Sequence, residues 1–245
     1  MSLQEWANVT EYDPRATLAI VFTDIIDSTK LSRAVGDKNM FDMLVKHFET
    51  ARSLCLLHDG FEIKLIGDAY MVVFKSADPA LQFALDFRRQ TGDARIDIRV
   101  GIHVGQVRVR DNDIYGLQVN LAERLSHVHV PGETGVFISS SAKRDIESEY
   151  GSDHKGLRFL SLSAAKLKGF DEKEREAVWQ VVTPEIRAAR TARLAERTRQ
   201  ELEAREKSST TVIQVEEPRA RLPRLDLGPR RYNVNPDYPN RTKNN

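Results

Sequence analysis

Residues 61–74 read Phe-Glu-Ile-Lys-Leu-Ile-Gly-Asp-Ala-Tyr-Met-Val-Val-Phe, and this stretch decides the fold. Two runs of strand length, Phe61–Ile66 and Tyr70–Phe74, are separated only by Gly67, Asp68 and Ala69, which is typical of a β-hairpin. Apolar residues at helical spacing lie on both sides of the hairpin. The hairpin is therefore expected between two helices.

The segments around the hairpin alternate between strand and helix. Before it, residues 17–22 form an apolar run of strand length, and residues 38–58 predict an amphipathic helix. After it, residues 79–90 predict a helix, and residues 96–100 and 106–110 predict two strands. This βαββαβ order predicts an α+β fold with a ferredoxin-like core. The apolar stripe expected on the first long helix consists of Phe41, Leu44, Val45, Phe48 and Ala51.

Beyond this core the sequence predicts further elements and then a change of character. The further elements are a helix at 117–125 and strands at 136–139, 157–162 and 177–182. Near Pro184 the composition shifts to arginine, glutamate and alanine, and later to proline-rich polar sequence with too little apolar surface to offset ordering entropy. The chain is accordingly expected to comprise an N-terminal extension (1–15), a folded domain (16–183), a solvated helix (184–207) and a disordered tail (208–245).

The composition excludes several classes of protein. The 245 residues carry 37 Lys plus Arg and 36 Asp plus Glu, so a net charge of +1 gives no field that favours nucleic acid or an anionic membrane. The single cysteine, Cys55, excludes a disulfide framework and a cysteine-rich zinc site. Apolar runs are far shorter than the roughly 20 residues that a membrane helix needs. We therefore expect a cytoplasmic protein with no membrane insertion and no nucleic-acid partner.

Two aspartates are candidates for one cation site. Asp24 follows the first strand and Asp68 lies in the hairpin turn, and these strands can be neighbours in a ferredoxin-like sheet. Two carboxylates that close repel each other unless a cation lies between them. Their hard oxygen ligands suit Mg²⁺ or Mn²⁺, especially when substrate phosphates complete the coordination. The alternative is that Asp24 only caps a helix and Asp68 only forms an Asx-turn.

Four motifs follow one another along the chain. They are Phe22-Thr23-Asp24-Ile25-Ile26-Asp27-Ser28-Thr29, Lys64-Leu65-Ile66-Gly67-Asp68, Asp113-Ile114-Tyr115-Gly116-Leu117-Gln118-Val119-Asn120-Leu121-Ala122-Glu123-Arg124 and Leu167-Lys168-Gly169-Phe170. In this order and spacing they resemble the catalytic domain of class III nucleotidyl cyclases, and the resemblance spans about residues 16 to 183.

The resemblance implies a reaction and its metal ligands. Asp24, Asp68 and the backbone carbonyl of Ile25 would hold two ions, Mg²⁺ or Mn²⁺. One ion would acidify the ribose 3′-hydroxyl of a nucleoside triphosphate, and the other would neutralise the triphosphate and the leaving pyrophosphate. The 3′-oxygen would attack the α-phosphorus and close a 3′,5′-cyclic monophosphate.

The resemblance also implies roles for substrate-binding residues. Asn120 would orient the ribose, and Arg124, four residues on and thus on the same helix face, would stabilise charge on the transferring phosphoryl group. Lys168 would bind the terminal phosphates. Lys64 and Asp113 would contact the base, and a lysine donor with a carboxylate acceptor complements adenine, which favours ATP. Without the motifs, Arg124 and Lys168 would be read as ordinary surface residues.

Several functions stay open at this stage. Bacterial relatives include standalone cyclases that make cyclic UMP or cyclic CMP in antiphage defence, and a cytosine amine could also donate to Asp113; GTP is a third choice of substrate. A catalytically silent cyclase-homology module that binds nucleotide or a partner is an alternative from another class. A palm-type polymerase or diguanylate cyclase fits less well, because its Gly-Gly-acidic-Glu-Phe turn is absent.

The family resemblance further implies a homodimer. The metal aspartates of one catalytic domain meet the base, ribose and phosphate contacts of another, and this chain carries both sets, so a head-to-tail homodimer would have two complete sites. Three positions depart from the family pattern. Asp27 and Glu123 replace residues that are often small, and Ala69 replaces a frequent glycine. The six histidines show no metal-ligand spacing that competes with the carboxylates.

Overall fold

The computed structural model describes residues 1–130, 135–150, 156–162 and 177–210. Within these residues eight strands form one sheet in the order β2-β3-β1-β4-β6-β8-β7, with β5 paired to β4. The strands β2-β3-β1-β4 are antiparallel neighbours, which confirms the ferredoxin-like core. The bounds are β1 (Arg15–Ile25), β2 (Phe61–Ile66), β3 (Ala69–Phe74), β4 (Ile98–Arg110), β5 (Asp113–Tyr115), β6 (Val136–Ser139), β7 (Arg158–Leu162) and β8 (Val178–Val182).

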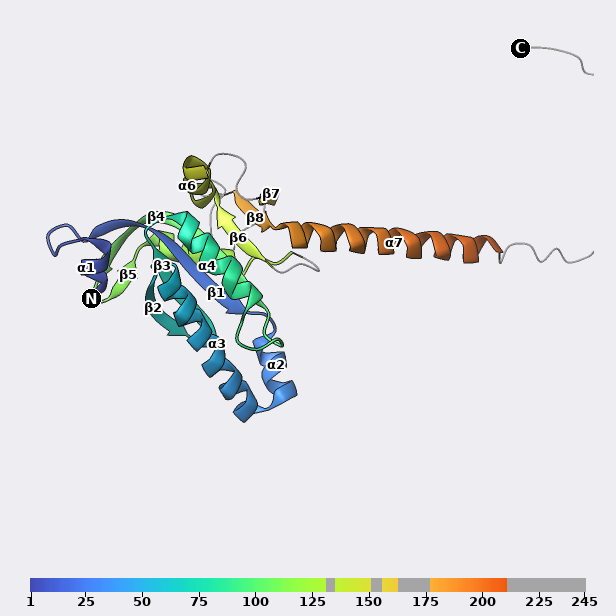
Figure 1. Ribbon diagram of the computed structural model, residues 1–245, viewed down its shortest axis with the longest axis horizontal. Helices are drawn as coiled ribbons and strands as arrows, with labels where there is room; N and C mark the ends of the chain where they lie inside the picture. The colour runs from blue at the N-terminus through green and yellow to red at the C-terminus, as the bar shows by residue number, and fades with distance from the viewer. Residues whose placement is uncertain (131–134, 151–155, 163–176, 211–245) are drawn as a thin grey trace, which may run out of the picture. The chain divides into compact units, whose positions relative to one another are not determined.

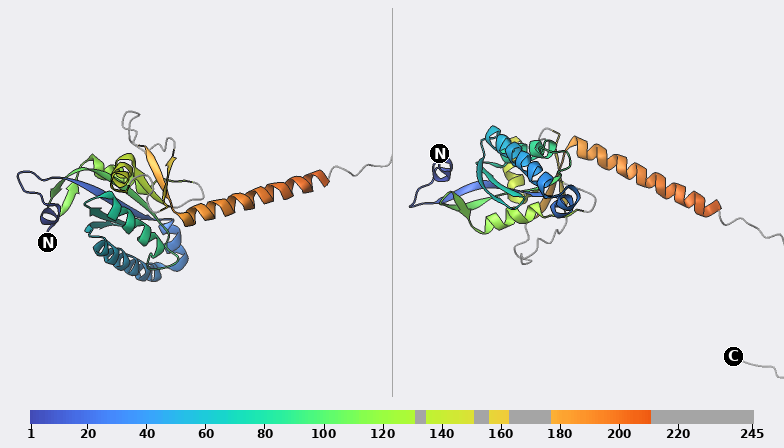
Figure 2. Two further views of the ribbon diagram at one scale, coloured as in Figure 1. Left: turned by 45° about the horizontal axis from the view of Figure 1, so that its top comes forward. Right: turned by 90° about the horizontal axis from the view of Figure 1, so that it is seen from below.

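Helices cover both faces of the sheet. The helices are α1 (Leu3–Ala7), α2 (Ser28–Val35), α3 (Asp37–Leu57), α4 (Ala77–Arg89), α5 (Leu117–Ser126), α6 (Ser140–Tyr150) and α7 (Pro184–Thr210). Helices α3 and α4 lie side by side on one face (Figure 1). Helix α5 lies on the opposite face from α3 (Figure 2). Successive side chains of β1 point to opposite faces of the sheet and therefore pack in two different cores. Val21 packs under α3 and α4, whereas Phe22 packs with α1 and α5.

The hairpin turn is tighter than the sequence suggested. Ile66 pairs with Ala69, so the loop has two residues, Gly67 and Asp68, and Ala69 already belongs to β3. Gly67 has φ +64 whereas Asp68 is not left-handed, which defines a type II′ turn. A glycine is favoured at the first position of this turn because it has no Cβ to oppose a positive φ.

Two expectations about the core elements are wrong. The strands expected at 96–100 and 106–110 form one strand, β4, which pairs with β1 without interruption from Ile25↔Ile98 to Arg15↔Arg108. On α3, Phe41 is 66% exposed and Val45 is 40% exposed. The buried face is rotated toward the residues next to that stripe, namely Met40, Met43, His47, Phe48, Ala51, Leu54 and Cys55.

The C-terminal region is described only in part. Residues 1–194 form one compact unit and residues 195–245 another, and α7 begins in the first and forms the described part of the second. Its two leucines, Leu194 and Leu202, are 67% and 55% exposed, as expected of a solvated helix. The tail expected to be disordered lies outside the described residues from 211 onward. Among the described helices, none combines the length and apolarity required to cross a membrane.

Candidate active site

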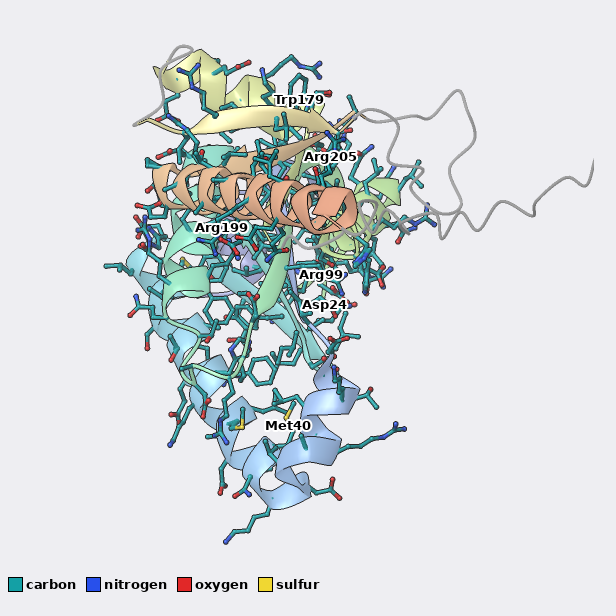
Figure 3. The ribbon with its side chains drawn as sticks, turned by 90° about the vertical axis from the view of Figure 1, so that its right-hand side faces the viewer. Asp24, Met40, Arg99, Trp179, Arg199 and Arg205 are labelled. Atoms are coloured by element: carbon teal, nitrogen blue, oxygen red, sulfur yellow. The ribbon has the colours of Figure 1, made fainter. Side chains whose placement is uncertain are left out.

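Asp24 lies one residue before the end of β1 and is held by an arginine. Its neighbour across the β1–β4 ladder is Arg99, and the guanidinium Nη2 donates to the Asp24 Oδ2 atom over 2.7 Å (Figure 3). The side chains are 15% (Asp24) and 19% (Arg99) exposed, so the pair is largely withdrawn from water. The arginine therefore neutralises and orients the carboxylate that the sequence singled out.

Asp68 lies beside the end of β1. The β1–β3 register ends with Thr23 paired with Tyr70, so the hairpin turn that carries Asp68 lies at the same end of the sheet as Asp24. The Oδ2 atom of Asp68 is buried and has no hydrogen-bond partner within the described residues. The sheet thus brings the two predicted carboxylates to one edge, one of them with an unsatisfied oxygen.

A buried histidine lies within the field of Asp68. His47 of α3 is fully buried, and its Nδ1 atom donates to the Thr91 carbonyl oxygen over 2.7 Å. Burial lowers the pKa of His47, while the bond to Thr91 and the negative charge of Asp68 oppose this shift. His47 is therefore neutral near pH 7 and leaves the charge of Asp68 uncompensated.

These residues fit a divalent cation. A buried carboxylate oxygen without a donor is costly unless it meets a positive charge, and Asp68 offers such an oxygen at the end of the sheet that also carries Asp24. The described residues hold no group of three or more His, Cys, Asp or Glu that could bind a metal ion unaided. Two carboxylates plus a carbonyl leave coordination positions for substrate phosphates, as Mg²⁺ and Mn²⁺ require.

Ile25 and Asp27 lie close to Asp24 in the chain, at the end of β1 and just beyond it. Ile25 is 2% exposed and its side chain packs in the core under the helices, so a backbone carbonyl is the ligand it has to offer. Asp27 occupies the N-cap position of α2 with φ +53, a left-handed conformation that aspartate tolerates, and its side chain makes no capping hydrogen bond. Its side chain is exposed and adds a negative charge to the loop next to Asp24.

Helix α5 carries Asn120 and Arg124 on the side that faces away from the sheet. A Cβ on Gly101 of β4 would lie 2.5 Å from the Ala122 carbonyl oxygen and 2.4 Å from the Ser126 nitrogen, so this side of α5 touches the strand backbone. Asn120 and Arg124 are each about 200° around the helix from Ala122. Asn120 is exposed and Arg124 is half-buried. The outward face therefore presents both side chains away from the sheet of their own chain.

The two residues predicted to contact the base meet each other. The Lys64 Nζ atom of β2 donates to the Asp113 Oδ2 atom of β5 over 2.5 Å, although the two residues are 49 positions apart. Asp113 also accepts from the backbone N–H of Ile114 over 2.9 Å. The pair is 43% and 24% exposed, so an incoming ligand can reach both groups.

Lys168 and Arg99 remain to be compared between the sequence predictions and the structure. Lys168 lies outside the described residues, so its role stays a prediction. Arg99 was not singled out, although its sequence position carried a signal. It is a charged residue in the alternating apolar run of Ile96, Ile98 and Val100, and a charge on an inner strand needs a partner.

Comparison with known proteins identifies the family. A solved structure of the adenylyl cyclase CyaB from P. aeruginosa matches with a TM-score of 0.56 and 26% identity, over 69% of this chain and 94% of that one. The fold is that of class III nucleotidyl cyclase catalytic domains. The sequence profile described as "Adenylate and Guanylate cyclase catalytic domain" matches residues 10–182. The chain belongs to this family.

The curated relatives are longer proteins. An uncharacterized protein of Mycobacterium tuberculosis is 28% identical over 157 residues, which cover 63% of this chain and 39% of that protein. An adenylate cyclase of Streptomyces coelicolor is 28% identical over 113 residues, which cover 45% of this chain and 30% of that enzyme. The chain therefore matches well under half of the length of these relatives.

Proposed function

We propose that this chain is a nucleotidyl cyclase that converts ATP to 3′,5′-cyclic AMP and pyrophosphate at sites shared by two copies of the chain. The observation that carries the proposal is the contact between Lys64 and Asp113, in a chain that also has Asp68, with its unpartnered buried oxygen, at the end of the sheet that carries Asp24. These two arrangements support a site for a base and a site for a triphosphate-bound cation. Each is built from residues that lie far apart in sequence.

The reaction is an internal phosphoryl transfer. The ribose 3′-oxygen forms a bond to the α-phosphorus, the bond from that phosphorus to the β-phosphate oxygen breaks, and the hydroxyl proton passes to solvent. Bound Mg²⁺ or Mn²⁺ would supply the charge that acidifies the 3′-hydroxyl and neutralises pyrophosphate. Asp24, Asp68 and the Ile25 carbonyl would hold these ions. Arg99, already on Asp24, keeps that carboxylate oriented and adds a positive charge at the same edge.

The roles of Asn120 and Arg124 require a second chain. Both project from the face of α5 that is turned away from its own sheet, so a substrate on the carboxylates of one chain would meet Asn120 and Arg124 of another. Asn120 would hold the ribose, and Arg124 would donate to phosphoryl oxygens as negative charge grows there. Lys168 would bind the terminal phosphates. A head-to-tail homodimer would supply two such sites.

The base is assigned from the complementarity of Lys64 and Asp113. A lysine donates and a carboxylate accepts, which matches a ring nitrogen and the exocyclic amine of adenine. The ion pair that the two residues form with each other supports this assignment, because groups this close together could both contact one edge of a planar ring. A cytosine amine could satisfy Asp113 in the same way, so CTP, UTP and GTP are the competing substrates in the test below.

The test is incubation of the purified protein with each of the four ribonucleoside triphosphates separately, with Mg²⁺ and with Mn²⁺, followed by mass spectrometry. Cyclic AMP as the main product supports the proposal. Cyclic UMP or cyclic CMP as the main product would assign a pyrimidine cyclase of the kind used in antiphage signalling. A linear or cyclic dinucleotide would indicate polymerase-like chemistry, and no product at all would indicate a binding module.

The metal role of Asp68 has its own prediction. Asp68→Asn keeps the size and turn preference of the residue but removes the charge, so turnover should fall by about 100-fold or more while the melting temperature changes little. Asp42→Asn, an equivalent change on the exposed face of α3, is the matched control and should behave as the unaltered protein. Turnover by Asp68→Asn that stays within about threefold of the unaltered protein would refute the metal role.

A further inference from the structure

Helix α1, which the sequence did not predict, packs against both strands that carry the base-contacting pair. Its Leu3 and Trp6 are 0% and 7% exposed and share one apolar cluster with Val107, Val109 and Ile114. The Trp6 ring lies 5.8 Å from the ring of Phe61 at the start of β2. Figure 1 shows α1 beside β5 at one end of the sheet. The helix therefore touches β2, which carries Lys64, and the β4–β5 hairpin, which carries Asp113.

A single hydrogen bond ties α1 to the turn of that hairpin. The first N–H groups of a helix have no acceptor within the helix. The Leu3 N–H donates instead to the Asn112 Oδ1 atom over 2.8 Å. Ser2 and Glu5 satisfy two further N–H groups through a capping box, so the start of α1 is fully defined. Asn112 thus caps a helix that lies 109 positions away in the chain.

The turn that contains Asn112 sets the position of Asp113. Asp111 and Asn112 have φ of +53 and +58, which defines a type I′ turn, and Asp113 follows directly as the first residue of β5. Strand β5 has three residues and pairs with β4 alone among the described strands, and its Ile114 is held in the apolar cluster that contains Leu3 and Trp6 of α1. Movement of the turn would therefore move the Asp113 carboxylate relative to Lys64.

We propose that α1 is a bracket that fixes the separation between Lys64 and Asp113 and so sets the affinity and selectivity for the base; this inference rests on the proposed function. Trp6 anchors the bracket to β2 and Leu3 anchors it to Asn112. Asn112 is a positioning residue, because it acts on the base through Asp113. Ground-state binding of the base contributes to KM, whereas Asn120 and Arg124 act on the transferring group, so loosening the bracket should change KM more than kcat.

The chain offers a clean variant and a matched control. Asn112→Gly removes the amide oxygen but leaves Asp-Gly, a favoured type I′ pair, so the turn itself is kept. Asn8→Gly makes the same replacement at a residue of nearly equal conformation, φ +54, at the other end of α1. Asn8 caps the helix through its backbone N–H, which glycine retains. Asn112→Asp keeps the oxygen acceptor and tests for rescue.

The experiment measures kcat and KM for each triphosphate together with amide hydrogen exchange in Leu3 and residues 113–115. Asn112→Gly should raise KM for the preferred triphosphate about two- to tenfold, the loss expected for one hydrogen bond, with kcat within about twofold. It should also reduce discrimination among bases and speed exchange in β5. Asn8→Gly and Asn112→Asp should resemble the unaltered protein. An unchanged KM and unchanged exchange in Asn112→Gly, or equal effects in Asn8→Gly, would overturn the bracket.

Failure of the bracket and failure of the proposed function are distinguishable. If the unaltered protein cyclises no triphosphate, the proposed function fails. The bracket is then decided by calorimetric binding of α,β-methylene-ATP and by the exchange data. Weaker binding and faster exchange confined to Asn112→Gly support it, and equal binding and exchange in all four proteins reject it.

Discussion

The two ion pairs of the candidate site differ in how deeply they are buried. Lys64 and Asp113 are 43% and 24% exposed, and a pair in such a setting contributes about 0–1 kcal/mol, so a base can displace it at little cost. Arg99 and Asp24 are 19% and 15% exposed, and removing one member of a buried pair costs about 3–5 kcal/mol. The pair proposed to contact the base is thus easily exchanged, whereas the carboxylate proposed to hold the metal is held firmly.

The buried imidazole of His47 predicts an acid-sensitive fold. Burial lowers its pKa below the ordinary 6.5, so between these two values the unfolded chain carries a proton that the folded chain lacks. Unfolding then takes up a proton, and the free energy of unfolding falls as the pH drops below about 6.5, by at most about 1.4 kcal/mol per pH unit. Above that range His47 is neutral in both states and contributes no pH dependence.

The measurement compares the unaltered protein with His47→Gln by denaturant unfolding from pH 7.5 to pH 5. Glutamine can donate to the Thr91 carbonyl but does not titrate, so the variant should lose less stability over this range even if it starts lower. Parallel curves for the two proteins would contradict a depressed His47 pKa.

The sequence singled out most residues of the candidate site but not their local partners. Asp24, Asp68, Lys64 and Asp113 were found through motifs and resemblance, and the structure brings the last two into contact. Arg99 was missed because its partner Asp24 lies 75 positions away, and only the β1–β4 register reveals that the two are neighbours. A cross-strand partner is a tertiary property that local pattern does not encode.

At the scale of single elements, the position of helix α5 depends on a close approach between its backbone and strand β4. Gly101 of β4 lets the helix backbone come so near that an added Cβ would stand 2.4–2.7 Å from the Ser126, Ala122 and Leu125 backbone atoms. Backbone cannot move aside as a side chain can. The glycine therefore determines how far Asn120 and Arg124 stand from the sheet.

Gly101→Ala should destabilise the protein by about 2–3 kcal/mol, the usual range for overpacking, and lower its melting temperature by about 4–10 °C. Gly105→Ala is the matched control in the same strand, because the nearest atoms that its Cβ would meet are side-chain atoms of Gln118 and His103. It should cost about 1 kcal/mol or less, since Gln118 can change rotamer. Differential scanning calorimetry decides, and equal losses in both variants would contradict the backbone clash.

Element by element, long periodic segments were predicted well and their details were not. Helix α3 was expected at 38–58 and spans Asp37–Leu57, yet its buried face was misassigned. Periodicity allowed two overlapping stripes, and packing of His47 against Phe87 of α4 decides between them. Strand β4 was split in the prediction because Gly101 and Gly105 weaken a strand pattern, whereas full pairing with β1 keeps it continuous. Helix α1 and strand β5 are too short for a periodic signal.

At the scale of the whole molecule, the orientation of α5 supports the proposal that a complete site needs two chains. Asn120 and Arg124 face away from the sheet whose edge carries Asp24 and Asp68, so each chain would contribute one half of each of two sites. Two variants test this division, since Asp68→Asn damages only the metal half and Arg124→Ala only the phosphoryl half. Each alone should have turnover reduced by about 100-fold or more.

Mixing the two inactive variants should restore activity. Random reassociation makes about half of the dimers mixed, and each mixed dimer pairs one intact metal half with one intact phosphoryl half, so about a quarter of the unaltered turnover should return. The other shared site in that dimer carries both defects. Recovery should appear as the subunits exchange and should be absent when Asp68→Asn is mixed with Asp24→Asn, because both changes damage the same half. A mixture of Asp68→Asn and Arg124→Ala that stays inactive after subunit exchange, as verified by native mass spectrometry, would show that each site is built within one chain.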